Sequence, residues 1–138
     1  MEKGGKGRPL RILVASPGLD AHDLPPMLFA MSMRDAGFEV IFLGIRQEVE
    51  RIVAVALQED VDIVALSIWG GIHLEVARDV VELLRQQSKE PIPVIVGGAV
   101  PPQDVPKLRE VGALEAFIPG TPTVEIAKFL HEKVKVNR

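Results

Sequence analysis

The residues best suited to chemistry stand in the stretch SPGLDAHDLPP (16–26), where a histidine lies between two aspartates. Imidazole is a good ligand for cobalt, zinc, iron or copper, and a carboxylate on the second ring nitrogen fixes its tautomer. Asp20, two residues before His22, is placed for that role if the loop is extended. The structural alternative is that Asp20 or Asp23 caps the next helix, whose first turn holds two prolines. Spacing alone favours the structural alternative.

A second loop, SIWGGIH (67–73), combines a hydroxyl group, the only tryptophan and two glycines. Ser67 offers the hydroxyl, and Gly70 lets the backbone approach a ligand closely. Trp69 either covers the end of the sheet or walls a pocket with its flat ring. His73 is expected to cap or pack at the start of a helix rather than to bind a metal.

Two further turns contain glycine. Gly97 and Gly98 directly follow the apolar run PVIV, where a glycine pair serves either as a plain turn or as room for a planar or phosphate-bearing ligand. The turn PGTP (119–122) is interpreted as structural unless a ligand reaches that far. Thr121 or Thr123 is expected to cap the last helix.

Strands and helices alternate along the chain. Near-continuous apolar runs are typical of buried parallel strands. They are predicted at Leu10 to Ala15, Val40 to Leu43, Ile63 to Ser67, Ile92 to Val96 and Ala116 to Ile118. Segments with helical apolar spacing follow each run, the first over Pro26 to Ala36, and Gly37 and Gly112 are predicted to end helices.

This alternation predicts an α/β fold, a flavodoxin-like (Rossmann-like) doubly wound sheet of five parallel strands in the order 2-1-3-4-5. In that order the loops after the first and third strands splay apart and form a crevice, and the loop after the fourth lies beside it. Phosphoryl transfer by a phospho-receiver domain is disfavoured, because Ala15 and Ser16, Ser67 and Pro119 stand where such a domain has its acidic residues and its lysine. SPGLDAHD is also a poor phosphate loop for a flavodoxin.

Composition sets the remaining bounds. The sequence of 138 residues predicts a flexible N-terminal tail, 1–9, followed by a single domain, 10–138. The net charge of -3 gives no case for binding nucleic acid or an anionic membrane, and the apolar runs are too short to span a bilayer. With no cysteine, a reducing cytoplasm is the expected location.

The chain resembles a known family over about Arg11 to Leu130. The resemblance is to the cobalamin-binding domain of methylmalonyl-CoA mutase and to the small subunits of related acyl-CoA mutases. Five ordered segments carry it: GLDAHD, RDAGFEVIFLG, ALQEDVDIVALS, VIVGGAVPPQD and IPGTPTVEI.

The resemblance implies a cofactor site. In the family a histidine is the lower axial ligand of cobalt, and the nucleotide tail of the cofactor lies in a slot between the first and third strands. Carried over, His22 would bind the cobalt of cobalamin and Asp20 would hydrogen-bond to His22. The predicted cofactor-binding residues are Asp20, His22, Ser67, Trp69, Gly70, Gly97, Gly98 and Gly120.

Two interpretations of function remain open. In the first, the chain is the adenosylcobalamin-carrying small subunit of a two-subunit mutase, with no catalytic residue of its own and a barrel-shaped large subunit as partner. In the second, cofactor binding is lost or altered, because Ser16, Leu24, Pro25 and Trp69 replace a lysine, an arginine, a glycine and a leucine of the family. The chain would then be a structural or regulatory subunit. A methyl-transfer carrier is disfavoured, because such carriers usually bring an extra helical domain.

Overall fold

A computed structural model describes residues 8–19, 21–69 and 71–136. Its sheet has five parallel strands in the order β2-β1-β3-β4-β5, as the sequence predicts. The strands are β1 Arg11–Pro17, β2 Glu39–Gln47, β3 Ile63–Ile68, β4 Val94–Gly98 and β5 Glu115–Ala116. Most of the predicted tail, residues 1–7 of 1–9, lies outside the described part of the chain.

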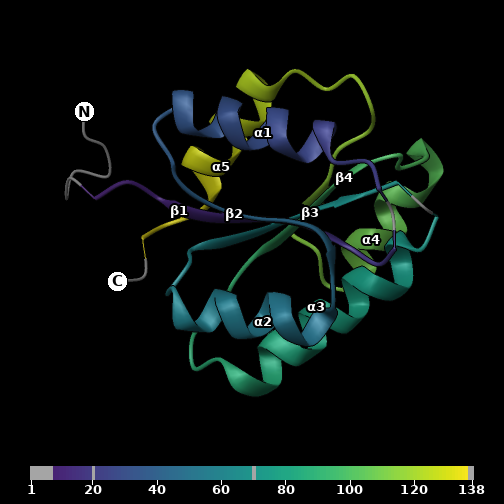
Figure 1. The fold of residues 1–138 in the computed structure, drawn as a ribbon, viewed down its shortest axis with the longest axis horizontal. Helices are drawn as coiled ribbons and strands as arrows, with labels where there is room; N and C mark the ends of the chain where they lie inside the picture. The colour runs from purple at the N-terminus through teal and green to yellow at the C-terminus, as the bar shows by residue number, and fades with distance from the viewer. Residues whose placement is uncertain (1–7, 20, 70, 137–138) are drawn as a thin grey trace.

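Helices cover both faces of the sheet (Figure 1). One face carries α1 Leu24–Asp35 and α5 Thr123–Lys133. The other carries α2 Val49–Gln58, α3 His73–Gln87 and α4 Val105–Glu110, which follows a short 3-10 turn, η1 Pro102–Asp104. Each face has its own apolar core, and the buried side chains of β1 and β3 alternate between the two cores. Burial on both faces explains why these strands are apolar without a break.

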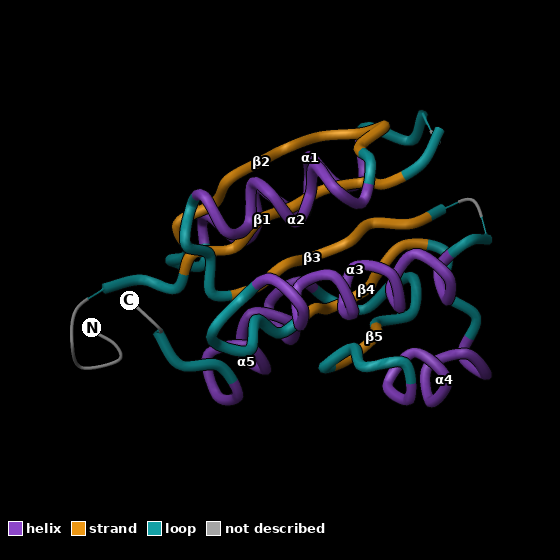
Figure 2. The backbone as a smooth tube through the Cα atoms, turned by 90° about the horizontal axis from the view of Figure 1, so that it is seen from below, coloured by secondary structure: helices purple, strands orange, loops and turns teal. Residues whose placement is uncertain are grey.

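The carboxyl ends of the strands meet at one edge of the sheet (Figure 2). The parallel pairs run in register from Ile12 beside Ile63 and from Val64 beside Val94, so the turns after β1, β3 and β4 come together there. None of the helices in the described part of the chain has the length and apolar character that crossing a bilayer needs.

The outer strands differ most from the prediction. β2 is longer than the predicted Val40 to Leu43, since its edge position lets half-exposed residues continue the ladder. β5 is shorter than the predicted Ala116 to Ile118 and pairs with β4 at two positions only. Beyond Ala116 the chain turns over the sheet edge, where Phe117 and Ile118 line a cavity.

Helix ends were predicted better than helix caps. Gly37 and Gly112 follow the ends of α1 and α4 with φ of 98° and 114°, a conformation that favours glycine. Asp23 occupies the position before α1, yet its side chain makes no capping hydrogen bond. The cap predicted for α5 is wrong, because Pro122 occupies the capping position and the Thr121 hydroxyl donates to the Ile118 carbonyl.

Candidate functional site

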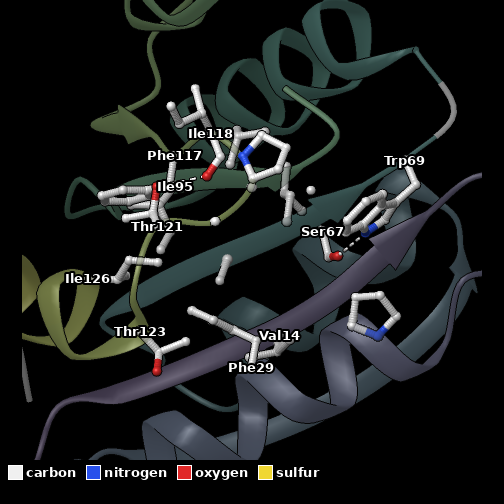
Figure 3. Close-up of a pocket in the computed structure, with 18 residues that line it drawn as sticks. Val14, Phe29, Ser67, Trp69, Ile95, Phe117, Ile118, Thr121, Thr123 and Ile126 are labelled. Atoms are coloured by element: carbon white, nitrogen blue, oxygen red, sulfur yellow. Dashed lines mark hydrogen bonds between the residues drawn. The ribbon is translucent and has the colours of Figure 1, made fainter. Parts of the chain in front are cut away.

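A cavity of about 200 Å3 opens at the carboxyl edge of the sheet, between α1 and α5 (Figure 3). Its floor is formed by Val14 of β1, Ala65 of β3 and Ile95 of β4. An apolar cavity of about 150 Å3 is enough to bind a benzene ring. The volume therefore suits a flat ring system, and the cavity reaches further across the sheet than the predicted slot between β1 and β3.

The walls of the cavity are mainly apolar. Phe29 of α1 and Ile126 of α5 close two sides, and Phe117 closes a third. The polar side chains among the lining residues are few: Ser67, Trp69, Thr121 and Thr123. An apolar pocket with a small number of placed polar groups is typical of a small-molecule site.

The two glycines that end β4 have different roles. A Cβ atom added to Gly97 would meet nothing within 4 Å, and the same holds for Gly120 across the cavity. Gly98 has φ of 105°, and a Cβ atom there would lie 2.9 Å from the carbonyl carbon of Ile68 and closer still to its oxygen. Gly97 thus leaves cavity space open, whereas Gly98 lets β3 and β4 approach each other closely.

Ser67 is the centre of a small hydrogen-bond network at the mouth of the cavity. The Trp69 Nε1–H donates to the Ser67 Oγ at 3.0 Å, and the hydroxyl of the buried Ser16 donates to the Ser67 carbonyl at 2.7 Å. Because the Ser67 Oγ already accepts a hydrogen bond, its own hydrogen remains to be donated. The site can therefore offer a donor to an acceptor atom, such as an unprotonated ring nitrogen.

His22 lies beside this network. Its imidazole stacks on the indole of Trp69, with ring centroids 5.5 Å apart and planes inclined by 17°. The histidine is exposed at the rim, while Trp69 and Pro25 line the cavity. The indole and the pyrrolidine ring therefore form walls of the cavity and do not fill it. The predicted Asp20 and Gly70 lie outside the described residues, so their contacts with this group stay predictions.

His73, the first residue of α3, packs as predicted and makes a polar contact away from the cavity. Its Nε2–H donates to the Oδ2 of Asp104 at 2.7 Å, and Lys107 lies 3.5 Å from the other carboxylate oxygen. The hydrogen bond from His73 lowers the pKa of Asp104 below its ordinary value of 3.8, and the charge of Lys107 acts in the same direction. This pair joins the turn after β3 to the turn after β4.

The His73–Asp104 contact predicts a pH dependence of stability. Because folding lowers the pKa of Asp104, its stabilising contribution is complete above pH 3.8 and is lost as the pH falls through the lower, folded-state value. Urea unfolding of the parent chain and of Asp104→Asn should differ in free energy at neutral pH. We expect the gap to narrow below about pH 4; a gap that persists unchanged in acid would contradict this role.

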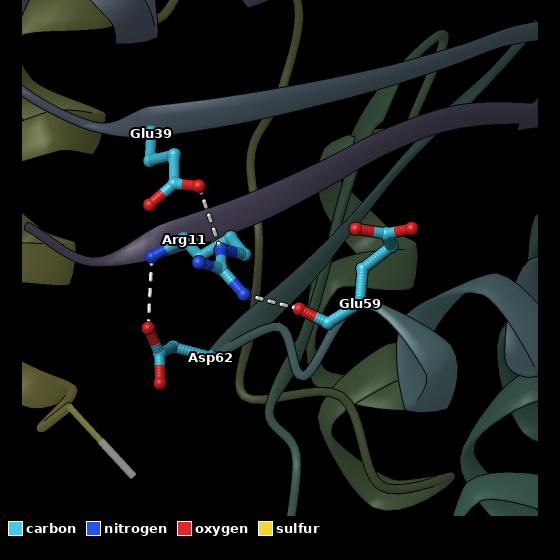
Figure 4. Close-up of polar contacts among 4 residues, drawn as sticks. All are labelled: Arg11, Glu39, Glu59 and Asp62. Carbon is cyan, nitrogen blue, oxygen red and sulfur yellow. Dashed lines mark hydrogen bonds and ion pairs between the residues drawn. The ribbon is translucent and has the colours of Figure 1, made fainter. Parts of the chain in front are cut away.

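A second polar cluster lies at the opposite, amino end of the strands (Figure 4). The Arg11 backbone N–H donates to the buried carboxylate of Asp62 at 2.8 Å. The Arg11 side chain contacts Glu39 at 2.9 Å and donates to the Glu59 carbonyl. These contacts fix the starts of β1, β2 and β3 to one another, and they take no part in the cavity.

Several cavity residues were not among the predicted site residues. Phe29, Thr123 and Ile126 come from helices, where their spacing indicates only a face turned toward the sheet. The sequence predicts a strand at Phe117 and Ile118, and Pro25 departs from the family motif; the structure places all three in the cavity wall. Among these residues, only Phe117 and Ile118 could have been found from the sequence, because they form an apolar pair directly before the PGTP turn.

Comparisons with known proteins agree with this geometry. A family model described as "B12 binding domain" matches residues 10–128. The 2-hydroxyisobutanoyl-CoA mutase small subunit of Aquincola tertiaricarbonis is 37% identical over 83% of this chain and 84% of its own. The pivalyl-CoA mutase small subunit of Xanthobacter autotrophicus is 38% identical over 88% of this chain and 81% of its own. A solved cobalamin-binding protein from Desulfitobacterium hafniense is 26% identical with a TM-score of 0.76, over 89% of this chain and 58% of its own.

These similarities confirm the predicted family and its cofactor, cobalamin. They match the resemblance from the five sequence segments, and the family match over residues 10–128 covers both the cavity and the His22 loop. They do not assign individual residues.

Proposed function

We propose that this chain is the cobalamin-carrying small subunit of a two-subunit acyl-CoA mutase. The chain belongs to the family of B12-binding domains. The observation that supports this most is the open apolar cavity with an imidazole at its rim. Residues that would narrow such a site, Pro25 and Trp69, stand in its wall and leave about 200 Å3 free.

The residues present fit the parts of the cofactor. The exposed imidazole of His22 is the kind of group that binds cobalt. The flat base of the nucleotide tail suits the apolar cavity, where the Ser67 hydroxyl can donate to its ring nitrogen. Gly97 and Gly120 leave open the space that side chains would otherwise fill.

The chemistry would be shared between two chains. Adenosylcobalamin, when bound, supplies the cobalt–carbon bond whose homolysis begins a carbon-skeleton rearrangement. The role of this chain is to hold the cofactor by its lower face and tail. The 2-hydroxyisobutanoyl-CoA and pivalyl-CoA mutase relatives are both named as small subunits, which supports a larger partner subunit that carries the acyl-CoA site. We further propose that this partner has the barrel fold.

One observation favours a second candidate function. The Trp69 indole stacks on His22 and donates to Ser67, so both groups that would meet the cofactor already have a partner within the chain. If that arrangement is too stable to open, the domain would serve as a structural or regulatory subunit with altered cofactor binding.

Retention of cobalamin by the purified chain tests the proposal. The chain is mixed with hydroxocobalamin, passed through a desalting column, and its visible spectrum is recorded. We expect retained corrin, and retention of cobinamide, which lacks the nucleotide tail, weaker by at least about tenfold because the cavity contacts are lost.

Two variants complete this test. His22→Ala should keep the tail in the cavity while altering the spectrum of the bound corrin. Trp69→Leu should strengthen retention if the indole competes for the site. Equal loss of cobalamin and cobinamide from the parent chain would contradict the proposal and favour the second candidate.

A further inference from the structure

The outer face of α1 is unusually apolar for a helix on the surface of a monomer. Its first ten residues, LPPMLFAMSM (24–33), contain no charged side chain. Pro26, Ala30 and Met33 are buried against the sheet. The large apolar residues on the other side are exposed: Leu24 by 58%, Met27 by 42%, Leu28 by 51% and Met31 by 47%.

These exposed residues lie on the same side of the sheet as an exposed aromatic residue of its edge strand. Positions 24, 27, 28 and 31 follow the three- and four-residue spacing of a single helix face. Phe42 of β2, 42% exposed, pairs in register with Val14, whose side chain belongs to the core beneath α1. We call the group Leu24, Met27, Leu28, Met31 and Phe42 the α1 patch. A contiguous apolar helix face of this kind marks an interaction site.

We propose that the α1 patch is covered by the α1 patch of a second copy of this chain, with the two helices antiparallel. The reason is a row of residues along the helix, Asp23, Met27, Met31 and Arg34, spaced by four, four and three residues. The row begins with a negative charge and ends with a positive one. When two copies of α1 pack antiparallel about a two-fold axis, Asp23 of each copy lies opposite Arg34 of the other. Met27 of each copy then lies opposite Met31 of the other.

The charges at the ends of the row are available for such contacts. The Asp23 side chain caps nothing on α1 and makes no hydrogen bond or ion pair within the described part of the chain. Arg34 is 67% exposed and lies 4.0 Å from its neighbour Asp35. An isologous interface requires a self-complementary surface of this kind.

Two other occupants fit the surface less well. A helix that binds a lipid surface is usually rich in Lys and Arg beside its apolar face. Here Arg34 is the single basic residue of α1, and the chain has a net charge of -3. Strand pairing along the open edge of β2 is disfavoured, because Gly44 and Arg46 have φ of 96° and 59° and interrupt the regular strand.

The size of the patch sets the expected affinity. Stable interfaces bury about 800 Å2 on each partner, and five side chains exposed by 42 to 58% provide less than this. We therefore expect a reversible dimer with a Kd of roughly 1–100 μM. Such a dimer dissociates on dilution.

Sedimentation equilibrium of the full chain without cofactor tests the dimer, whether or not the domain binds cobalamin. Between about 1 and 500 μM, the average mass should rise from 15.1 kDa toward twice that value. Met27→Glu with Met31→Glu should remain monomeric throughout. The control, Gln86→Glu with Gln87→Glu on the exposed face of α3, adds the same charge and should dimerise like the parent chain.

A charge exchange tests the antiparallel arrangement. Asp23→Arg and Arg34→Asp should each weaken the dimer by about three- to tenfold, and the double variant should restore it. Circular dichroism confirms that every variant is folded. A parent chain that is monomeric up to the highest concentration overturns the proposal, as does a dimer that the methionine variants leave intact. Flotation of the monomer with anionic vesicles would assign the patch to a lipid surface instead.

Discussion

Replacing Gly97 by leucine should weaken cobalamin binding by up to about 100-fold while leaving the domain folded. A Cβ atom at this position meets nothing within 4 Å, and the residue lines the cavity. The leucine side chain would therefore occupy space that the nucleotide tail needs, and overfilling a packed site costs about 1–3 kcal/mol, or up to about 100-fold in affinity. Retention on a desalting column and titration by visible absorbance measure the loss.

The control for this prediction is graded. Gly97→Ala adds a single methyl group and should weaken binding by less than about tenfold. Both variants should unfold at a denaturant concentration equal to or above that of the parent chain, because replacing glycine in a strand restricts the unfolded state. If Gly97→Leu binds cobalamin as tightly as the parent, the tail does not enter this cavity.

Replacing the adjacent Gly98 by alanine should instead destabilise the whole domain. Its φ of 105° is strained for any residue with a side chain, and the added Cβ atom would overlap the Ile68 carbonyl oxygen. Backbone atoms of a central strand cannot move aside as a flexible side chain can. We expect a loss of at least about 3 kcal/mol in the free energy of unfolding.

Urea unfolding followed by circular dichroism measures this loss. Gly97→Ala is the matched control, because it makes the same substitution one residue earlier on the same strand. A Gly98→Ala variant as stable as this control would show that β3 and β4 lie further apart than the structure places them.

The fold could be predicted because its strands are buried on both faces. β1 and β3 form continuous apolar runs, and Gly37 and Gly112 mark helix ends through a backbone conformation that few other residues adopt. The limits of β2 were harder to predict, because an edge strand mixes exposed and half-buried residues. The apolar run Val40 to Leu43 indicates a strand but does not indicate where the hydrogen-bonded ladder of β2 ends.

The candidate site could be predicted only in part. Loops after parallel strands must meet at one edge, which was enough to bring His22, Ser67 and Gly97 together. The stacking of His22 on Trp69 depends on side chains from two turns that are far apart in sequence, and no local pattern indicates it. In the same way, the sequence does not distinguish the roles of Gly97 and Gly98. The difference arises because only Gly98 lies against the Ile68 backbone.

Electron paramagnetic resonance can show whether His22 is the protein ligand of the cobalt of cobalamin. The chain is produced with nitrogen-15 histidine, loaded with unlabelled cobalamin, and reduced to the Co(II) state. A bound nitrogen-15 nucleus splits each cobalt line in two, whereas the unlabelled nitrogen of the cofactor's own base splits it in three. We predict two-fold splitting in the labelled parent chain and its loss in His22→Ala. Three-fold splitting, or no splitting, in the labelled parent chain would contradict ligation by His22.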